Sequence, residues 1–220
     1  MKEFIQNYGE IIWTATGQTL SMTTITLLLS VIIGIPLGIL LVTTREGGLY
    51  ANKTLYSISN WCINILRSIP FIILLFLILP ITKIVAGTTI GIRGVILPLT
   101  VYAAPYIARM VETSLLEVNS GIVEAYQSMG VANQKIIWLV MLREARSAII
   151  RALTISLISL IGATAMAGLV GAGGLGDIAY QYGFQRYQPD LMYATIILLI
   201  VLVQVIQSLG NFIAARLKHD

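Results

Sequence analysis

Five apolar stretches, each long enough to cross a lipid bilayer, constrain the fold of this chain more than any other feature. They cover about residues 18–44, 56–82, 89–114, 148–170 and 190–213. A helix needs about 20 mainly apolar residues to cross about 30 Å of hydrocarbon. Composition agrees, because 57% of the 220 residues are hydrophobic and only 11% are charged. The sequence therefore predicts an all-α polytopic membrane protein of five transmembrane helices, forming a single domain over residues 1–220.

The stretch at 56–82 is the least regular of the five. Its continuous apolar run covers only residues 69–81, and the part before it contains Asn60, Asn64 and Arg67. Apolar residues recur in that part at helical spacing: Leu55, Ile58, Cys62 and Ile65. We therefore expect an interfacial helix that lies along the membrane surface, followed by a steeper segment that starts at Pro70.

Lys and Arg residues in the short loops predict the orientation of the chain. With five spans the termini lie on opposite sides, so the 14 basic residues form two sets. Ten share the side of the C-terminus and four share the side of the N-terminus: Arg45, Lys53, Arg67, Arg109, Lys135, Arg143, Arg146, Arg151, Arg216 and Lys218 against Lys2, Lys83, Arg93 and Arg186. We expect a cytoplasmic C-terminus and an N-terminus outside. Basic loops facing anionic lipid also explain the pI of about 9.3 without a nucleic-acid partner.

Several classes of site are not expected in this chain. No short apolar segment with a cleavage site precedes the first span, so we predict no signal peptide. The single cysteine, Cys62, excludes an intrachain disulfide, and the single histidine, His219, leaves no basis for a zinc site. A membrane-embedded enzyme would need a nucleophile, a base and an acid, and we predict no catalytic residue here.

A charged segment between the third and fourth spans, residues 115–147, predicts a cytoplasmic loop. Apolar residues recur in it at i, i+3, i+4 and i+7, which is typical of a short amphipathic helix: Ile122, Ala125, Tyr126 and Met129. Asn119 or Ser120 can cap its start, and Gly130 can end it at positive φ. Asn133 then offers a start signal for a second helix. Periodicity leaves two interpretations open, a helix that shields the underside of the bundle and a docking surface for a cytoplasmic partner.

This loop, about residues 119–135 with the segment that follows, resembles the EAA loop of permease subunits of bacterial ABC importers. The pattern is Glu-Ala-Ala, three residues, Gly, nine residues, then Ile-x-Leu-Pro. Four residues match in register and Val140 is a conservative match: Glu124, Ala125, Gly130 and Leu142. Tyr126 replaces the second alanine, which puts a bulky residue on the apolar face. Arg143 replaces the proline, which predicts a straighter path into the fourth span.

Three further stretches resemble the methionine-uptake permeases of that superfamily. They are RSIPFIILL at 67–75, LPLTVYAAPYIARMVETSLLEV at 97–118 and VGAGGLGDIAYQYGF at 170–184. They occur in the right order, and the resemblance covers most of the chain. It implies the type I ABC importer fold and transport of D- or L-methionine. Another amino acid, glycine betaine or a phosphonate are the alternative substrates.

The resemblance also implies partners. The permease would work as a homodimer in the bacterial inner membrane, with two copies of an ATPase subunit that bind ATP and Mg, and with an extracytoplasmic binding protein or lipoprotein. The loop helix would sit in a groove of the ATPase. The coupling residues implied are Glu124, Ala125, Tyr126, Met129 and Gly130. No cofactor is expected in this chain itself.

The absence of a G-x-x-x-x-G-K-[ST] loop agrees with ATP binding elsewhere than in this chain. GAGGLG at 171–176 contains a loose G-x-G-x-x-G pattern, but it follows a transmembrane stretch and is predicted to lie outside. A dinucleotide fold is therefore not expected. We interpret this segment as a flexible turn near the outer end of the pathway.

Small residues gather in the fourth span and favour close helix packing: Gly162, Ala163, Thr164, Ala165, Ala167 and Gly168. The alternative is that the span lines the transport pathway, with Met166, Thr164 and Gly168 as candidate residues.

No ionisable residue lies at the centre of a predicted span. Arg67, Arg109 and Glu112 lie toward the cytoplasmic ends, where snorkelling or an interfacial ion pair accounts for them. This pattern disfavours a transporter driven by an ion gradient, which is the alternative functional class.

Overall fold

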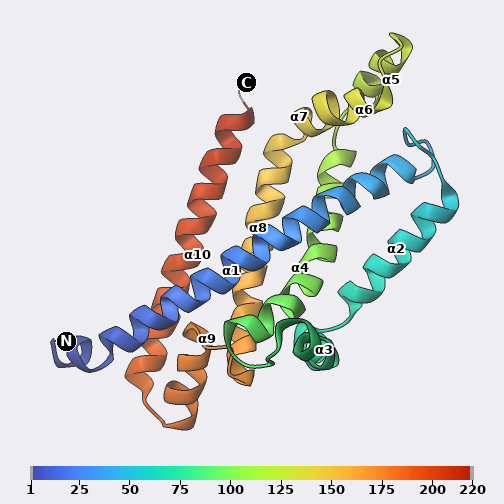
Figure 1. Ribbon diagram of the computed structural model, residues 1–220. Helices are drawn as coiled ribbons and strands as arrows, with labels where there is room; N and C mark the ends of the chain where they lie inside the picture. The colour runs from blue at the N-terminus through green and yellow to red at the C-terminus, as the bar shows by residue number, and fades with distance from the viewer. Residues whose placement is uncertain (1, 219–220) are drawn as a thin grey trace. The chain divides into compact units, whose positions relative to one another are not determined.

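The computed structural model describes residues 2–218, and side chains from Tyr8 onward. His219 lies outside the described residues. Every regular element in this range is helical, which confirms the predicted all-α class. Figure 1 labels the α-helices. The chain up to Ser128 contains α1 (Lys2–Thr44), α2 (Lys53–Ser68), α3 (Phe71–Ala86), α4 (Gly91–Leu116) and α5 (Ser120–Ser128). The chain from Asn133 on contains α6 (Asn133–Lys135), the π-helix η1 (Ile136–Met141), α7 (Leu142–Glu144), α8 (Arg146–Ala167), the 3₁₀ turn η2 (Gly168–Val170), α9 (Leu175–Ile178), the π-helix η3 (Ala179–Gln185) and α10 (Pro189–Lys218).

Four helical segments are long and apolar enough to span a membrane: Tyr8–Thr44, Gly91–Leu116, Arg146–Val170 and Pro189–Lys218. The pair α2 and α3 makes a fifth if it is counted as one broken span, because a sharp bend separates the two helices. The break falls at the expected Pro70, which has extended backbone angles of −55° and 138°. Proline also disfavours helical geometry in the residue before it. Whether α2 lies along the membrane surface stays a prediction.

The chain divides into two compact units. Unit 1 holds the chain up to Leu29 together with Ile69–Ala103 and Leu157–Ile206, and unit 2 holds Ser30–Ser68, Ala104–Ser156 and the chain from Gln207 on. The ten basic residues that the loop rule assigns to one side all belong to unit 2, and the other four all belong to unit 1. Each predicted set of basic residues therefore lies within a single unit.

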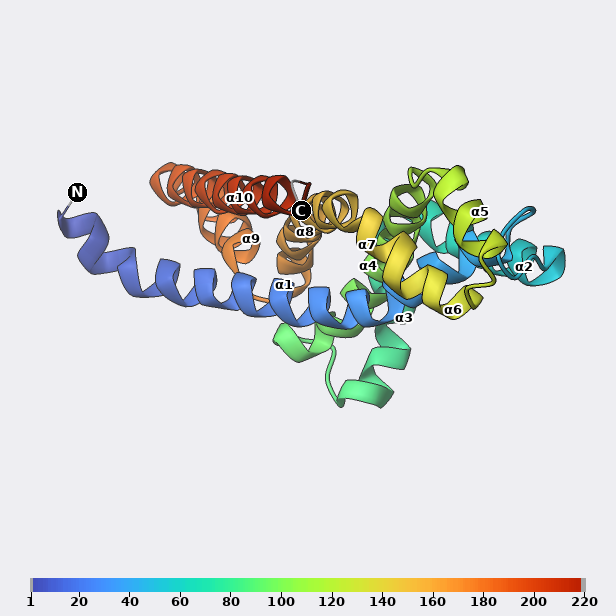
Figure 2. The same cartoon turned by 90° about the horizontal axis from the view of Figure 1, so that it is seen from above.

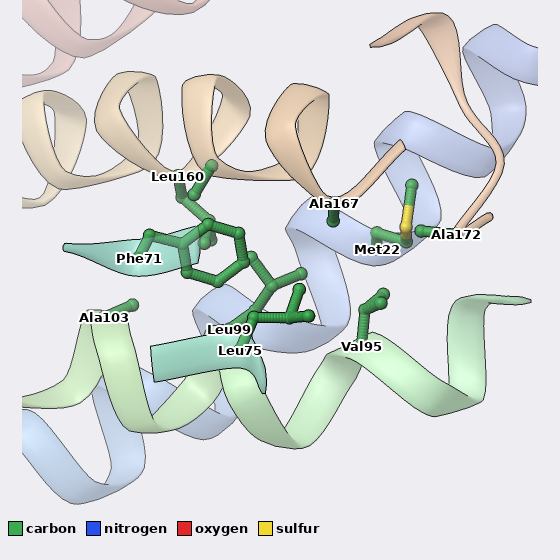
Figure 3. Packing of buried hydrophobic residues seen from close by; sticks show 10 residues of the cluster. Met22, Phe71, Leu75, Val95, Leu99, Ala103, Leu160, Ala167 and Ala172 are labelled. Carbon is green, nitrogen blue, oxygen red and sulfur yellow. The ribbon is translucent and has the colours of Figure 1, made fainter. Parts of the chain in front are cut away.

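Unit 1 is built around an apolar cluster in which α1, α3, α4 and α8 each contribute side chains (Figure 3). Met22, Leu75, Leu99 and Leu160 are fully or almost fully buried there. The ring of Phe71 packs edge-on against Tyr102, with 5.3 Å between the centroids. Such contacts stabilise a bundle in lipid through van der Waals packing, since lipid is as apolar as the side chains.

Unit 2 holds α1 close to α4 by means of two glycines. A Cβ at Gly38 would lie 2.7 Å from the carbonyl oxygen of Ala108, and one at Gly34 would lie 2.7 Å from Ile107 Cγ2. The Gly34-x-x-x-Gly38 spacing therefore lets the two helices approach backbone to backbone. Helix α2 joins this contact, because Ile63 of α2 forms one buried cluster with Leu41 of α1 and Ala108 of α4.

A polar cluster joins α2 to α4 within unit 2. Arg109 pairs with Glu112 at 2.5 Å, and its other terminal nitrogen donates to Asn60 Oδ1 at 2.6 Å and Asn64 Oδ1 at 2.8 Å. This is the one ion pair among the described side chains, Tyr8 to Lys218. Arg109 and Glu112 thus form the ion pair expected of them, and Arg109 also binds two asparagines of α2.

The glycine contact yields a stability test. Gly38→Ala forces a methyl group onto the backbone of α4, so we expect overpacking to lower the free energy of unfolding by about 1 to 3 kcal/mol. Gly17→Ala in the same helix is the control, because a Cβ at Gly17 meets nothing within 4 Å. Thermal unfolding of the purified protein in detergent should show a lower midpoint for Gly38→Ala only. Equal midpoints for the two variants would contradict the close α1–α4 contact.

Candidate functional site

The loop helix predicted from the sequence is α5, which Figures 1 and 2 show at the tip of the segment that joins α4 to α6. It contains 9 residues, Ser120–Ser128. Of the two expected caps, Asn119 is the one used, because its side-chain oxygen accepts a hydrogen bond from Gly121 N at 2.8 Å. This cap satisfies one of the free N–H groups at the start of the helix.

Gly130 ends the helix as predicted, with φ at +75°. The N–H of Val131 donates to Tyr126 O at 3.1 Å, and the N–H of Gly130 donates to Gln127 O at 2.9 Å. These two bonds form a Schellman motif, which needs a residue in the left-handed region at the glycine position. Both ends of this short helix are therefore fixed by its own sequence.

The apolar face of α5 is uncovered within the described chain. No residue of the helix is buried, and Tyr126 and Met129 are 37% and 67% exposed. Ala125 is also exposed, and Ile122 is half-buried. A helix that shields the underside of the bundle would bury this face against its own chain. The described chain does not cover this face, and the docking of a partner there stays a prediction.

Glu124 does not occupy the place expected for a carboxylate that interacts with the helix dipole. The first turn of α5 contains no acidic residue, and Glu124 lies in the second turn. The dipole effect is confined to the terminal turn, so Glu124 does not stabilise the start of α5 in this way. Glu124 instead borders a hollow of about 410 Å³ whose other lining residues include Arg45, Glu46 and Gln127. Its carboxylate makes no ion pair with any side chain that the structure describes, from Tyr8 on.

Asn133 is the first residue of α6, not its cap. The N-cap is Ala132, which makes no side-chain bond to the helix. The Asn133 amide instead donates to Leu49 O at 2.9 Å, a bond between residues 84 apart in the sequence. From Asn133 the chain is helical through α6, η1 and α7 to Glu144, and α8 begins at Arg146, after the single intervening residue Ala145. The segment that carries Arg143 in place of proline thus runs almost unbroken into the fourth span.

The glycine-rich segment at 171–176 is hydrogen-bonded to α1. This corrects the expectation of a flexible turn. Gly174 N donates to Gln18 Oε1 at 2.8 Å, and Leu175 N donates to Thr19 Oγ1 at 2.9 Å. Gly171, Gly173 and Gly174 all have positive φ, so glycine is needed for the path of the backbone. The sequence did hold a signal for the two partners, since Gln18 and Thr19 are polar residues at the start of an apolar stretch.

The three candidate pathway residues have different environments. Thr164 is buried and donates its hydroxyl to Ile161 O at 2.7 Å. Gly168 is also buried, and the backbone of Gly176 and Asp177 leaves no room for a side chain on it. Both therefore serve the packing of unit 1. Met166 is 50% exposed, so it alone of the three is available to line a path.

Comparison with known proteins decides the family. The profile of the family described as "Binding-protein-dependent transport system inner membrane component" matches residues 34–219. This chain belongs to that family. The resemblance to methionine-uptake permeases is also confirmed, because relatives of this type match the permease over most of its length.

Two relatives illustrate the match. The probable D-methionine transport system permease protein MetI of Vibrio cholerae is 47% identical over 211 residues, which cover 96% of the permease and 94% of that protein. The methionine import system permease protein MetP of Bacillus subtilis is 42% identical over 202 residues, which cover 92% and 91%.

Solved structures agree on the fold. A chain of the MetNI methionine ABC transporter in an inward-facing conformation superposes with a TM-score of 0.94 at 44% identity, covering 96% of the permease and 98% of that chain. A chain of an amino acid ABC transporter solved with histidines gives a TM-score of 0.80 at 17% identity, and it shows the fold alone. The permease is therefore a multi-pass, all-α membrane protein of the ABC importer class.

The Schellman motif gives a local test. Gly130→Val places a β-branched side chain in the left-handed region at a cost of about 1 to 2 kcal/mol. Nothing lies within 4 Å of the position where its Cβ would be, so strain alone acts. We expect faster amide hydrogen exchange in the last turn of α5. Gly130→Asn is the control, because asparagine tolerates this conformation. Unchanged exchange in Gly130→Val would contradict the assigned helix end.

Proposed function

We propose that this chain is the permease subunit of an ATP-driven importer that moves methionine into the cytoplasm. The observation that carries the proposal is the uncovered apolar face of α5, a helix fixed at both ends and placed in the loop that resembles the EAA motif. The methionine-transport names of the relatives support the substrate.

The proposed assembly contains two copies of this chain and two copies of an ATPase subunit. A solute-binding protein or lipoprotein delivers the substrate from outside. The family description, which names binding-protein-dependent transport, and the likeness to the MetNI transporter support these partners. ATP and Mg are held by the ATPase in this proposal, and this chain carries no cofactor. Helix α10 buries little of its apolar surface in its own chain, as expected for a helix that faces lipid or a second copy.

The coupling residues take distinct roles in this proposal. Ala125, Tyr126 and Met129 form the apolar contact with a groove on the ATPase, and Glu124 meets a basic residue of that partner. Gly130 ends the helix at the angle that the groove requires. A short helix with two fixed ends moves as one body, so a push from the ATPase reaches α4 at one end and α8 at the other. On the pathway side, Met166 is the residue we assign to contact an apolar substrate.

The first experiment measures uptake in proteoliposomes that contain the permease with its ATPase, supplied with ATP inside and with loaded binding protein outside. We expect ATP-dependent uptake of labelled methionine. Met129→Asp introduces a charge into the apolar contact, and burying an unpaired carboxylate is costly, so uptake should fall at least about tenfold. The ATPase should no longer co-purify with this variant, while its level in the membrane stays normal because the apolar spans decide insertion.

Ser128→Asp is the matched control, since it adds the same charge one residue earlier, on another face of α5. It should keep the ATPase and the uptake. Failure of both variants would show that any charge at this end of the helix is harmful and would remove the assignment of an apolar docking face. Uptake of glycine betaine, a phosphonate or another amino acid in place of methionine would overturn the substrate. Uptake that follows the membrane potential instead of ATP would overturn the importer class.

The orientation proposed here has the N-terminus outside and the C-terminus in the cytoplasm, supported by the separation of the ten and four basic residues into different units. Single cysteines at two exposed positions, Gln134→Cys and Gln185→Cys, test it in a Cys62→Ser background. An impermeant maleimide added to intact cells should label only Gln185→Cys, and inverted vesicles should give the opposite result. Labelling of both variants in intact cells would exclude the orientation.

A further inference from the structure

The turn that joins α1 to α2, residues 45–52, has a fixed conformation. Tyr50 N donates to Thr43 O at 2.8 Å and Asn52 N donates to Thr44 O at 2.8 Å, so the chain folds back on the last turn of α1. Gly48 lies so close to the backbone of Thr43 that no side chain fits there. We call this segment the α1–α2 turn.

The same turn is bound to the helix that follows it. Asn52 Oδ1 accepts a hydrogen bond from Leu55 N at 3.0 Å, which caps α2. Thr43 and Thr44 are buried at the end of α1. Hydrogen bonds therefore join the α1–α2 turn to the end of α1 and to the start of α2. A displacement of the turn displaces both helices.

Asn133 is the link between this turn and the coupling segment, which we define as residues 119–145. Its amide donates to Leu49 O at 2.9 Å and is half-buried. Within the part of the chain that the structure describes, this is the one hydrogen bond between the two segments. The bond does not cap α6, whose N-cap is Ala132. The Asn133 side chain is thus not used for the stability of its own helix.

Helix α5 of the coupling segment is separated from the α1–α2 turn by a hollow. A hollow of about 410 Å³ is lined by Arg45, Glu46 and Leu49 of the turn and by Val123, Glu124 and Gln127 of α5. Because this hollow intervenes, α5 does not pack tightly on the turn along its length. The join lies at Asn133, just beyond the C-terminal end of α5.

We propose that Asn133 is a positioning residue that carries the movement of the coupling segment into α1 and α2. The proposal rests on the proposed function, in which the ATPase moves α5. The chain connects α5 in sequence to α4 and α8, and the Asn133 bond adds a direct link from the coupling segment to the turn between α1 and α2. The competing route to α2 runs from α4, through the Arg109 bonds to Asn60 and Asn64 and through the packing of Ile63 on Ala108 and Leu41. The two routes make different predictions.

The test uses spin labels in the complete complex, with Cys62 replaced by serine. One label sits on α2 at Ser57→Cys, an exposed position, and a second sits on α5 at Ser128→Cys, also exposed. Trapping the ATPase with ATP and vanadate should change the spectra of both labels. In Asn133→Ala the α5 label should still respond and the response of the α2 label should be lost. If the α2 label responds equally in Asn133→Ala, the signal reaches α2 from α4 and the proposal is wrong.

Two more variants separate the hydrogen bond from other effects. Asn133→Asp has the same shape, but a carboxylate cannot donate to a carbonyl, so it should behave as Asn133→Ala does. Gln134→Ala removes the amide of the next residue, which is exposed and makes no side-chain hydrogen bond to the described chain, and should behave as the unaltered protein does. Uptake in the two Asn133 variants should fall by roughly fivefold, the factor that one hydrogen bond of ordinary net strength supports. A normal α2 response in Asn133→Asp would contradict the proposal.

The outcomes also distinguish this inference from the proposed function. If the α5 label in the otherwise unaltered complex does not respond to nucleotide, the docking of α5 is wrong. If that label responds and the α2 label does not, α5 docks but the turn does not follow it, and only the role of Asn133 falls. Normal membrane levels of Asn133→Ala are expected in either case, because the apolar spans decide insertion.

Discussion

Backbone polar groups cannot be left unpaired in hydrocarbon, and the whole structure depends on this constraint. It makes every long apolar stretch a helix and allows irregular backbone only where side chains or packed protein satisfy it. The segment at 171–176 shows the rule, since Gly174 and Leu175 donate their N–H groups to Gln18 and Thr19 of α1. These two polar residues lie in an apolar helix because they accept hydrogen bonds from the backbone of another segment. The same hydrogen bonds fix the place of α9 within unit 1.

Close packing supplies the stiffness that movement by rigid bodies requires. Helices in lipid gain no hydrophobic free energy from contact with one another, so they depend on short distances and many van der Waals contacts. Gly34 and Gly38 bring α1 onto α4 in unit 2, and Gly176 brings α9 against the backbone of α8 at Ala165 in unit 1. A contact of this kind has no flexible side chain between the two backbones. A displacement of one helix is therefore passed to the next with little loss.

Local chemistry predicted the parts of the structure that local contacts determine. The apolar stretches, the Asn119 cap, the positive φ of Gly130 and the break at Pro70 each depend on residues a few positions apart. The errors have the opposite character. Asn133 was expected to start a helix by capping it, yet its amide binds Leu49, and the glycine-rich turn was expected to be flexible, yet it is bound by α1 residues 156 positions away. Thr164 and Gly168 are a similar case. The sequence left open whether they pack against other helices or line a path, and the structure shows both of them buried in unit 1. One sequence shows residue types but not which distant segments meet.

The design of α5 follows from its length. A helix of 9 residues is about 14 Å long and is far too short to be stable alone in water. The Asn119 cap and the Schellman motif at Gly130 hold it formed before any partner arrives, so docking does not have to order the backbone. What docking can still contribute is the burial of the exposed parts of Met129 and Tyr126, which are 67% and 37% exposed. Full burial of a large apolar side chain contributes about 1.5 to 3 kcal/mol, so Met129 has the larger share left to contribute. In the proposed assembly, therefore, the ATPase acts on the open face of α5, and its force enters the membrane helices at the two ends that the chain fixes.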